Sequence, residues 1–405
     1  MENTLKAIMV ILDGLGDYIH PVYGKTPLMA AKRLTLKKRE KESETGLMQP
    51  IFPGLPVGSD TGHLALFGYD PFKYYAGRGA YEALGAGFEL QEKDVAFRLN
   101  FATLKDGKII DRRAGRSDYG LKEIVKELNF ETKDAQFIVL HTTEHRGVLI
   151  IRPKRNINLG KDVEDFDSEI LHLPKRLNDD DSNKWTEVLL EEFITRSIKL
   201  LKDHRMNKER ESKKLLPANI VLLRGAGKLP RYKKISEMFG IKMVCVAGGA
   251  LYKGVAKSVG IDVVNVEGAT GDKNTNLGMK ITTAIKLKES YDVVFLHIKA
   301  TDNFGHDGDF EGKKNFIEKV DKYLKYLFDA FDIVLITADH STPVTVKRHT
   351  GDPVPIMLWS KPELGITRPD NGTFDELSQG LLRVTALDVL RLIRNKLNRV
   401  QKFGE

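Results

Sequence analysis

Cysteine and long apolar runs are almost absent from this sequence, and each absence excludes a class of protein. Cys245 is the only cysteine among 405 residues, so the chain forms no internal disulfide. No run of eighteen apolar residues occurs, which excludes a membrane-spanning helix. The short apolar stretch at the amino terminus lacks a small-residue cleavage pattern, so we read no signal peptide. We therefore expect a cytoplasmic protein with no membrane partner.

The charge balance is basic, with a formal net charge of +8. Hydrophobic residues make up 41% of the chain, enough for two or three domains with a sizeable core. Lysine and arginine are concentrated in residues 33–42 and 202–214, but acids are interleaved with them and aromatic stacking residues are missing. Such runs are typical of solvated surface, so we expect no nucleic-acid partner.

Three apolar segments that are far apart in the chain each end near an aspartate. AIMVIL precedes Asp13, VVFLHIKAT precedes Asp302 and IVLITA precedes Asp339. An apolar, β-branched run of this length predicts a buried parallel strand, and open α/β sheets bind ligands at the carboxyl ends of their strands. Carboxylates buried together at one edge need cations beside them. The pattern therefore predicts a metal site.

Three histidines accompany these aspartates. His306 and His340 lie four residues and one residue after Asp302 and Asp339, and His349 follows in KRHTGDPVP. An isolated aspartate after a strand is more often a turn or cap residue, so the prediction depends on the whole cluster. Carboxylate oxygen and imidazole nitrogen are ligands of divalent ions. We expect two such ions, with manganese favoured and magnesium, cobalt or zinc also compatible.

Ser59 lies in GSDTGHLALF, just before an apolar helical stretch. The free N–H groups and the positive dipole at a helix start favour a bound phosphate and an ionised hydroxyl. Coordination to a divalent ion would supply the activation that a serine needs to attack at neutral pH. The alternative is a helix N-cap, which Ser, Asp and Thr at 59–61 all favour. Beside three strand-end aspartates, we favour the nucleophile.

The predicted elements divide the chain into a discontinuous domain and an insertion. From residue 217 to 405, strands beginning with ANIVLLRGAG alternate with helical stretches, the pattern of a doubly wound parallel sheet. Residues 88–214 are predicted to form a mixed α/β unit with antiparallel strands. Because the metal ligands divide between 1–85 and 217–405, these segments should form one domain. The sequence thus predicts an α/β fold with a mostly parallel sheet and an inserted, smaller lid domain at 88–214.

Taken in order, the motifs resemble a known family. AIMVILDG, GSDTGH, KATDNFGHDGD, TADHSTPV and HTGDPVP are similar to those of the cofactor-independent phosphoglycerate mutases of archaeal type, in the alkaline phosphatase superfamily. The resemblance covers nearly the whole chain and is weakest at 33–45 and 160–214. It implies an alkaline-phosphatase-like fold. It also implies a first metal ion held by Asp13, Ser59, Asp339 and His340, and a second held by Asp302, His306 and His349.

The resemblance also implies a reaction. Ser59 would take the phosphoryl group from 2- or 3-phosphoglycerate and return it to the other hydroxyl, with no bisphosphoglycerate needed, in glycolysis and gluconeogenesis. The inserted segment would hold this small-molecule substrate, because planar guanidinium groups suit both its carboxylate and its phosphate. For each candidate taken alone, the alternative is that it only contributes charge to the protein surface and does not bind substrate. The candidates are Arg112, Arg113, Arg116, His145, Arg146 and, outside the insertion, Lys253.

Two other activities of the same superfamily remain alternatives. A metal-dependent phosphatase or phosphodiesterase would use the same serine and ions, but water would complete the second half of its reaction. A phosphopentomutase would act on a sugar phosphate that lacks the carboxylate. Closure of the inserted domain would exclude water, which would separate a mutase from a phosphatase.

Overall fold

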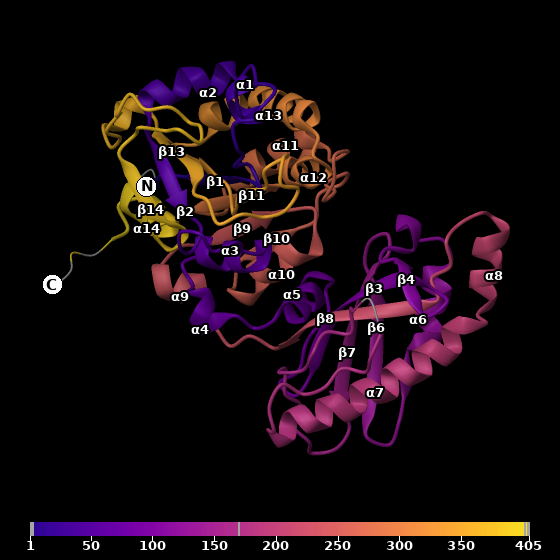
Figure 1. Cartoon of the computed structure of the whole chain (residues 1–405). Coiled ribbons are helices and arrows are strands. Elements are labelled where there is room, and N and C mark those ends of the chain that lie inside the picture. The colour runs from indigo at the N-terminus through magenta and orange to yellow at the C-terminus, as the bar shows by residue number, and fades with distance from the viewer. Residues whose placement is uncertain (1–3, 169–170, 401, 403–405) are drawn as a thin grey trace. The chain divides into compact units, whose positions relative to one another are not determined.

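The computed structural model describes residues 4–168, 171–400 and 402 (Figure 1). The chain divides into two compact units: Met1–Tyr75 with Tyr232–Glu405 form unit 1, and Ala76–Arg231 form unit 2. We expected the breaks at 85–88 and 214–217, so unit 2 is larger at both ends than the insertion we predicted. Within the described ranges, no helix is long and apolar enough to cross a membrane.

Unit 1 is built on an eight-stranded sheet that is mostly parallel. The neighbouring strands from β10 to β12 run parallel, whereas β13 is antiparallel to both β12 and β2. This confirms the predicted α/β fold class. In spatial order the strands are β10 (Asp262–Val264), β9 (Met243–Val246), β11 (Val293–Ile298), β1 (Ala7–Leu12), β12 (Ile333–Thr337), β13 (Val354–Ser360), β2 (Glu44–Gln49) and β14 (Leu382–Thr385).

Helices cover both faces of this sheet (Figure 1). Every residue of β1, β11 and β12 is buried, which explains why these segments lack polar alternation. The long helix α13 packs against α1, α2, α11 and α12, and α3 packs against α10 and α14. The helices of unit 1 are α1 (Pro27–Ala30), α2 (Leu34–Arg39), η1 (Glu40–Glu42), α3 (Ser59–Leu66), α4 (Pro71–Tyr74), α9 (Ile235–Phe239), α10 (Ala250–Ser258), α11 (Leu277–Leu287), α12 (Ala300–Asp307), α13 (Phe310–Ala330), η3 (Pro362–Leu364) and α14 (Ala386–Lys396).

The three strand-end aspartates meet because β1 lies between β11 and β12 and is parallel to both. Asp13 and Asp339 lie just beyond β1 and β12, and Asp302 lies in the first turn of α12. The chain turns sharply after Asp13 at Gly14, which has φ +62°. A Cβ there would lie 2.6 Å from Thr342 Oγ1, so only glycine fits both the backbone angle and the space.

Unit 2 contains a second sheet, with six strands that pair antiparallel. The strands are β4 (Lys108–Asp111), β3 (Val95–Lys105), β7 (Arg146–Pro153), β6 (Ala135–His141) and β5 (Phe130–Glu131) in spatial order, with β8 (Ile220–Lys228) beside β3. The helices are α5 (Arg78–Gly85), η2 (Ala114–Arg116), α6 (Leu121–Leu128), α7 (Asp181–Lys202) and α8 (Arg205–Ser212).

The placement of ANIVLLRGAG in the parallel sheet was wrong. This segment forms β8, which pairs antiparallel with β3 from Val95 opposite Lys228 to Ala102 opposite Ile220. An apolar run predicts a strand but does not specify its partner. The partner here is set by side chains such as Leu223, which is buried in the core of unit 2.

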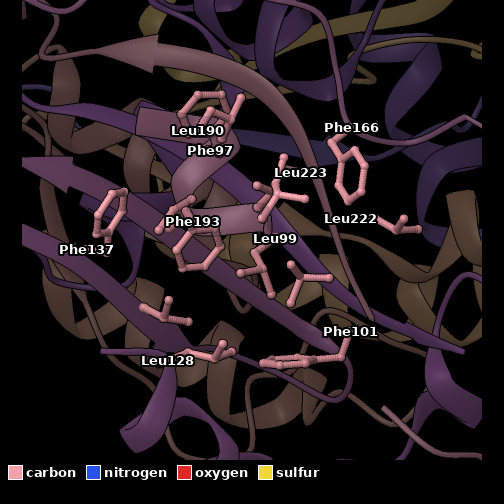
Figure 2. Close-up of a cluster of buried hydrophobic side chains, with 14 of the residues drawn as sticks. Phe97, Leu99, Phe101, Leu128, Phe137, Phe166, Leu190, Phe193, Leu222 and Leu223 are labelled. Carbon is pink, nitrogen blue, oxygen red and sulfur yellow. The ribbon is translucent and has the colours of Figure 1, made fainter. Parts of the chain in front are cut away.

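The core of unit 2 lies between its sheet and α7 (Figure 2). Alternate residues of β3, including Phe97 and Leu99, pack there with Phe193 of α7. Because side chains alternate along a strand, Arg98 and Asn100 lie on the opposite face, which is also the face where Ala96 packs in a separate apolar cluster. One face of this sheet therefore packs in the main core, and the other carries polar groups beside a smaller apolar cluster.

Candidate active site

The donor atoms of the predicted ligands form two groups in unit 1. Within each group, all the atoms lie within 4.8 Å of one another. The first group is Asp13, Asp339 and His340, and the second is Asp302, His340 and His349. All of these side chains except that of His349 are fully buried. Folding thus collects strand-end groups from three parts of the chain into a site that could hold two ions.

Ser59 points its hydroxyl into this cluster. It is the first residue of α3, and the N-cap is Gly58 rather than Ser59. The alternative that Ser59 is an N-cap therefore does not hold. Ser59 Oγ lies 3.1 Å from His340 Nε2, and the residue is 5% exposed. The geometry therefore places the hydroxyl among the candidate metal ligands.

His340 lies between the two groups. Its Nε2 is 3.5 Å from Asp13 Oδ1 and 3.3 Å from Asp339 Oδ2. Its ring stacks on that of His349, with the centroids 3.6 Å apart and the planes 21° from parallel. The resemblance assigned His340 to the first ion alone, whereas the structure places it within reach of both groups.

His306 lies at the exposed side of the second group. Its Nε2 is 3.4 Å from Asp302 Oδ1 and 3.3 Å from His349 Nε2, and its side chain is 43% exposed. The other ring nitrogen bonds the carbonyl of Lys347 at 3.0 Å. The corresponding nitrogen of His349 bonds the Val57 carbonyl at 2.7 Å. Each imidazole therefore uses Nδ1 on a backbone carbonyl and turns Nε2 toward the other ring and Asp302, in the arrangement typical of metal-binding histidines.

The electrostatics of the cluster suit cations. Burial by itself would raise the pKa of the Asp339 carboxyl, but His340 and His63 beside it hold this pKa below its ordinary value. Burial would likewise raise the pKa of Asp302, but the positive charge of Lys299 holds this pKa well below its ordinary value. Asp339 Oδ2 is buried and accepts no aligned hydrogen bond, although two histidines lie 3.3 Å away. An ionised, incompletely bonded carboxylate with imidazole neighbours fits a divalent metal ion.

In unit 2, several cationic side chains lie without acidic partners. Arg98, Arg113, Arg116 and Arg146 form no ion pair with a carboxylate in the part of the chain that the structure describes. Burial, and after it the charges of Arg146, Arg113 and Arg98, lower the pKa of His145 to about 3. Two buried nitrogen atoms, Nδ1 of His145 and Nε of Arg98, have no hydrogen-bond partner. A group of cations left unpaired in this way is suited to an anionic ligand.

The remaining two predicted substrate residues already have partners. Arg112 pairs with the side chain of Asp167, which also accepts from Arg224 Nε at 2.8 Å. Lys253 lies in α10 of unit 1, where its ammonium donates to Asn265 Oδ1 at 2.9 Å. The structure therefore groups Arg113, Arg116 and Arg146 as a cationic cluster around the neutral imidazole of His145, and leaves Arg112 and Lys253 in local contacts.

Comparisons with known proteins agree with the cluster in unit 1. Residues 5–390 match the family model of the Metalloenzyme superfamily. The chain is 42% identical to 2,3-bisphosphoglycerate-independent phosphoglycerate mutase 1 of Archaeoglobus fulgidus, over 99% of this chain and all of that protein. It is 43% identical to the mutase of Ignicoccus hospitalis, with the same coverage. The chain belongs to the family of 2,3-bisphosphoglycerate-independent phosphoglycerate mutases. It is therefore an isomerase and a metalloenzyme, and the predicted family is confirmed.

A solved structure of this mutase family extends the agreement to the fold. The cofactor-independent phosphoglycerate mutase from Thermoplasma acidophilum is 33% identical, covers 97% of this chain and all of its own, and superimposes with a TM-score of 0.67. A protein from Pyrococcus horikoshii is 35% identical, with a TM-score of 0.84 over 99% of this chain.

Sequence reasoning missed three residues of the mutase site. Lys299 places its ammonium 2.9 Å from Asp13 Oδ1 and 2.6 Å from Asp302 Oδ2, so it bridges one carboxylate of each group. His297 Nε2 lies 2.8 Å from Asp13 Oδ2, and His63 Nδ1 lies 2.6 Å from the Ser59 carbonyl. The apolar run of β11 offered one signal, since His297 lies at its carboxyl end and Lys299 directly follows it. The function of His63 had no comparable signal, because a histidine in a helix is usually just a polar surface or core group.

Proposed function

We propose that this mutase interconverts 2-phosphoglycerate and 3-phosphoglycerate through a phosphoserine at Ser59, without bisphosphoglycerate. The names of its relatives supply the substrate class. The observation that carries the residue assignment is the position of the Ser59 hydroxyl, 3.1 Å from a histidine that belongs to both donor groups. A serine in this position could receive a phosphoryl group while the rest of the substrate stays bound.

We assign separate roles in phosphoryl transfer to the residues of unit 1. Asp13, Asp339 and His340 would hold one divalent ion beside Ser59, and Asp302, His306 and His349 would hold the second. When bound, two such ions lower the pKa of a coordinated hydroxyl and neutralise the oxygens of the transferring phosphoryl group. The start of α3 adds backbone N–H groups and a positive dipole beside Ser59 Oγ. Manganese is the ion that we propose, with magnesium, cobalt and zinc as alternatives.

The cationic cluster of unit 2 is proposed to bind the substrate. Arg113, Arg116, Arg146 and His145 are the residues that we assign, and we add Arg98 because its charge also acts on His145. The arginines share a positive charge without an ion-paired carboxylate, and the neutral imidazole of His145 lies among them, which supports recognition of a carboxylate or a phosphate. Arg112 and Lys253 remain weaker candidates because each has a local partner. Unit 1 would then be the catalytic domain, and unit 2 would be the lid that excludes water during transfer.

The biological setting follows from the substrate. Interconversion of the two phosphoglycerates is a step of glycolysis and gluconeogenesis, so we propose a cytoplasmic location. The proposed partner is the small-molecule substrate alone, with no nucleic acid or membrane.

A metal add-back assay tests the proposal. Chelated protein is given 3-phosphoglycerate with one divalent ion at a time, and 2-phosphoglycerate and free phosphate are measured together. We expect 2-phosphoglycerate to accumulate with little free phosphate, and manganese to restore the highest rate. Release of free phosphate without the 2-isomer would instead establish a phosphatase, and activity on pentose phosphates in place of phosphoglycerate would establish a phosphopentomutase.

A further inference from the structure

Arg210 is a fully buried arginine for which the proposed reaction has no use. It lies in α8 within residues 202–214, which the sequence led us to expect as solvated surface, yet it is 0% exposed. Among the described residues, no carboxylate lies within ion-pair distance of its guanidinium. The guanidinium instead donates to four backbone carbonyls: those of Leu216 at 2.8 Å, Ser117 at 3.2 Å, Tyr119 at 2.6 Å and Ala114 at 2.8 Å.

Burying a cation with no carboxylate in contact costs free energy, and the charge of Asp118 offsets only part of this cost. Burial lowers the pKa of the Arg210 guanidinium, which reflects the cost of removing it from water. An apolar side chain of similar volume would avoid this desolvation. Such a side chain, however, has no hydrogen-bond donors, whereas the planar guanidinium can hold several carbonyl oxygens at once. The placement of Arg210 therefore indicates that it holds these backbone segments in a defined conformation.

The carbonyls that Arg210 holds belong mainly to residues 114–119, the loop next to Arg113 and containing Arg116. This loop has an unusual backbone. Ala114, Gly115 and Arg116 have φ values of +43°, +67° and +59° in succession. A left-handed conformation costs about 1 kcal/mol or more at a non-glycine residue, so Ala114 and Arg116 on either side of Gly115 keep it only where surrounding contacts enforce it.

We propose that Arg210 is a positioning residue for substrate binding, fixing the left-handed loop that presents the guanidinium groups of Arg113 and Arg116. This inference rests on the proposed function, in which these two arginines bind phosphoglycerate. A loop that is ordered before the anion arrives loses little conformational freedom on binding. Loss of Arg210 should therefore weaken binding while leaving the chemistry at Ser59 in unit 1 intact.

The test compares four kinds of variant in the metal-loaded, full-length enzyme. Arg210→Met removes the donors, and Arg210→Lys keeps the positive charge but cannot reach four carbonyls. Arg205→Met removes a charge from the same helix, where the side chain is 80% exposed and lies beside Met206 and Glu209 of α8. Arg113→Ala and Arg116→Ala report the contribution of the presented arginines themselves.

We expect Arg210→Lys and Arg210→Met to raise KM for 3-phosphoglycerate about tenfold or more while kcat stays within about threefold. Arg205→Met should leave both constants unchanged. Limited trypsin digestion should cut after Arg113 or Arg116 sooner in the Arg210 variants than in the wild type, because the loop is released. If Arg210→Met fails to fold, Arg210→Lys carries the comparison.

The outcomes separate this inference from the proposed function. A raised KM in Arg116→Ala beside an unchanged KM in Arg210→Lys would overturn the positioning role alone. Equal falls in kcat and thermal stability with KM unchanged would show that Arg210 only supports the fold, and would also overturn it. Unchanged KM in Arg113→Ala and Arg116→Ala would overturn the proposed binding role of these arginines, and the positioning role with it.

Discussion

Ser59 Oγ and His340 Nε2 lie 3.1 Å apart, although 281 positions separate the two residues in the chain. Ser59 is brought there by the first turn of α3, and His340 by the end of β12. Both elements border the edge where the parallel strands end. The contact therefore joins the proposed nucleophile directly to the proposed metal site.

Substitution of Ser59 should abolish activity without unfolding the protein. Ser59→Ala removes the proposed phosphoryl acceptor, so we expect the mutase rate to fall by about a thousandfold or more. Because Gly58 and not Ser59 is the N-cap of α3, the free energy of unfolding should change by less than about 1 kcal/mol. A coupled mutase assay and urea denaturation measure the two effects.

The matched control is Thr61→Ala, two residues along the same helix. Its hydroxyl donates to the Gly58 carbonyl at 2.9 Å and takes no part in the donor groups. This variant should keep nearly full activity. Comparable activity in Ser59→Ala would refute the phosphoserine mechanism.

Metal affinity should depend more on His349 than on His306. His349 belongs to a compact donor group and is anchored to the Val57 carbonyl at 2.7 Å, whereas His306 is more exposed and outside that group. We expect His349→Ala to weaken binding of the second ion by about 100-fold and His306→Ala by about tenfold. Calorimetric titration of chelated protein with manganese measures both. The ranking fails if His306→Ala proves the more damaging change.

Lys299 should stabilise the metal-free protein more than the metal-loaded protein. Its ammonium bridges Asp13 and Asp302, and removing it from a site without metal leaves buried carboxylates without a cation. We expect Lys299→Met to lose about 3 kcal/mol of unfolding free energy after chelation, and clearly less with manganese present. Denaturation curves with and without metal give the comparison, and equal losses in both would contradict it.

His145 gives unit 2 a specific response to acid. Burial, followed by the neighbouring arginines, lowers its pKa from the ordinary 6.5 to about 3 in the folded protein. Between these pH values the unfolded chain binds a proton at His145 and the folded protein does not. The stability is therefore unaffected by His145 above pH 6.5 and decreases as the pH falls toward 3. His145→Gln has no such proton to bind. As the pH falls through this window, the unfolding free energy of the wild type should therefore fall by up to about 4 kcal/mol more than that of His145→Gln. A constant difference would show that His145 titrates normally.

The sequence predicted that the three strand-end aspartates would lie together because its signal was strong. Apolar runs before Asp13, Asp302 and Asp339 could only be buried strands, and parallel strands share one carboxyl edge. The same reasoning failed for β8, since an apolar run does not identify the sheet that it joins. In the structure this strand lies beside β3 in unit 2.

Other features left no signal that spacing could detect. Arg210 lies in a stretch dense with lysine and glutamate, and its burial depends on carbonyls more than ninety positions away in the chain. Lys299 adjoins a predicted ligand segment, but a lysine near carboxylates is common on surfaces. Only the fold shows that its ammonium joins Asp13 to Asp302.

The central claim is that the phosphoryl group passes through Ser59. Enzyme turning over 3-phosphoglycerate can be quenched in acid within milliseconds and its peptides analysed by mass spectrometry. The account predicts one phosphoryl group on the peptide that contains Ser59, appearing and decaying at rates fast enough for turnover. An active enzyme that carries no phosphoryl group at this serine, or carries it on another residue, would contradict the account.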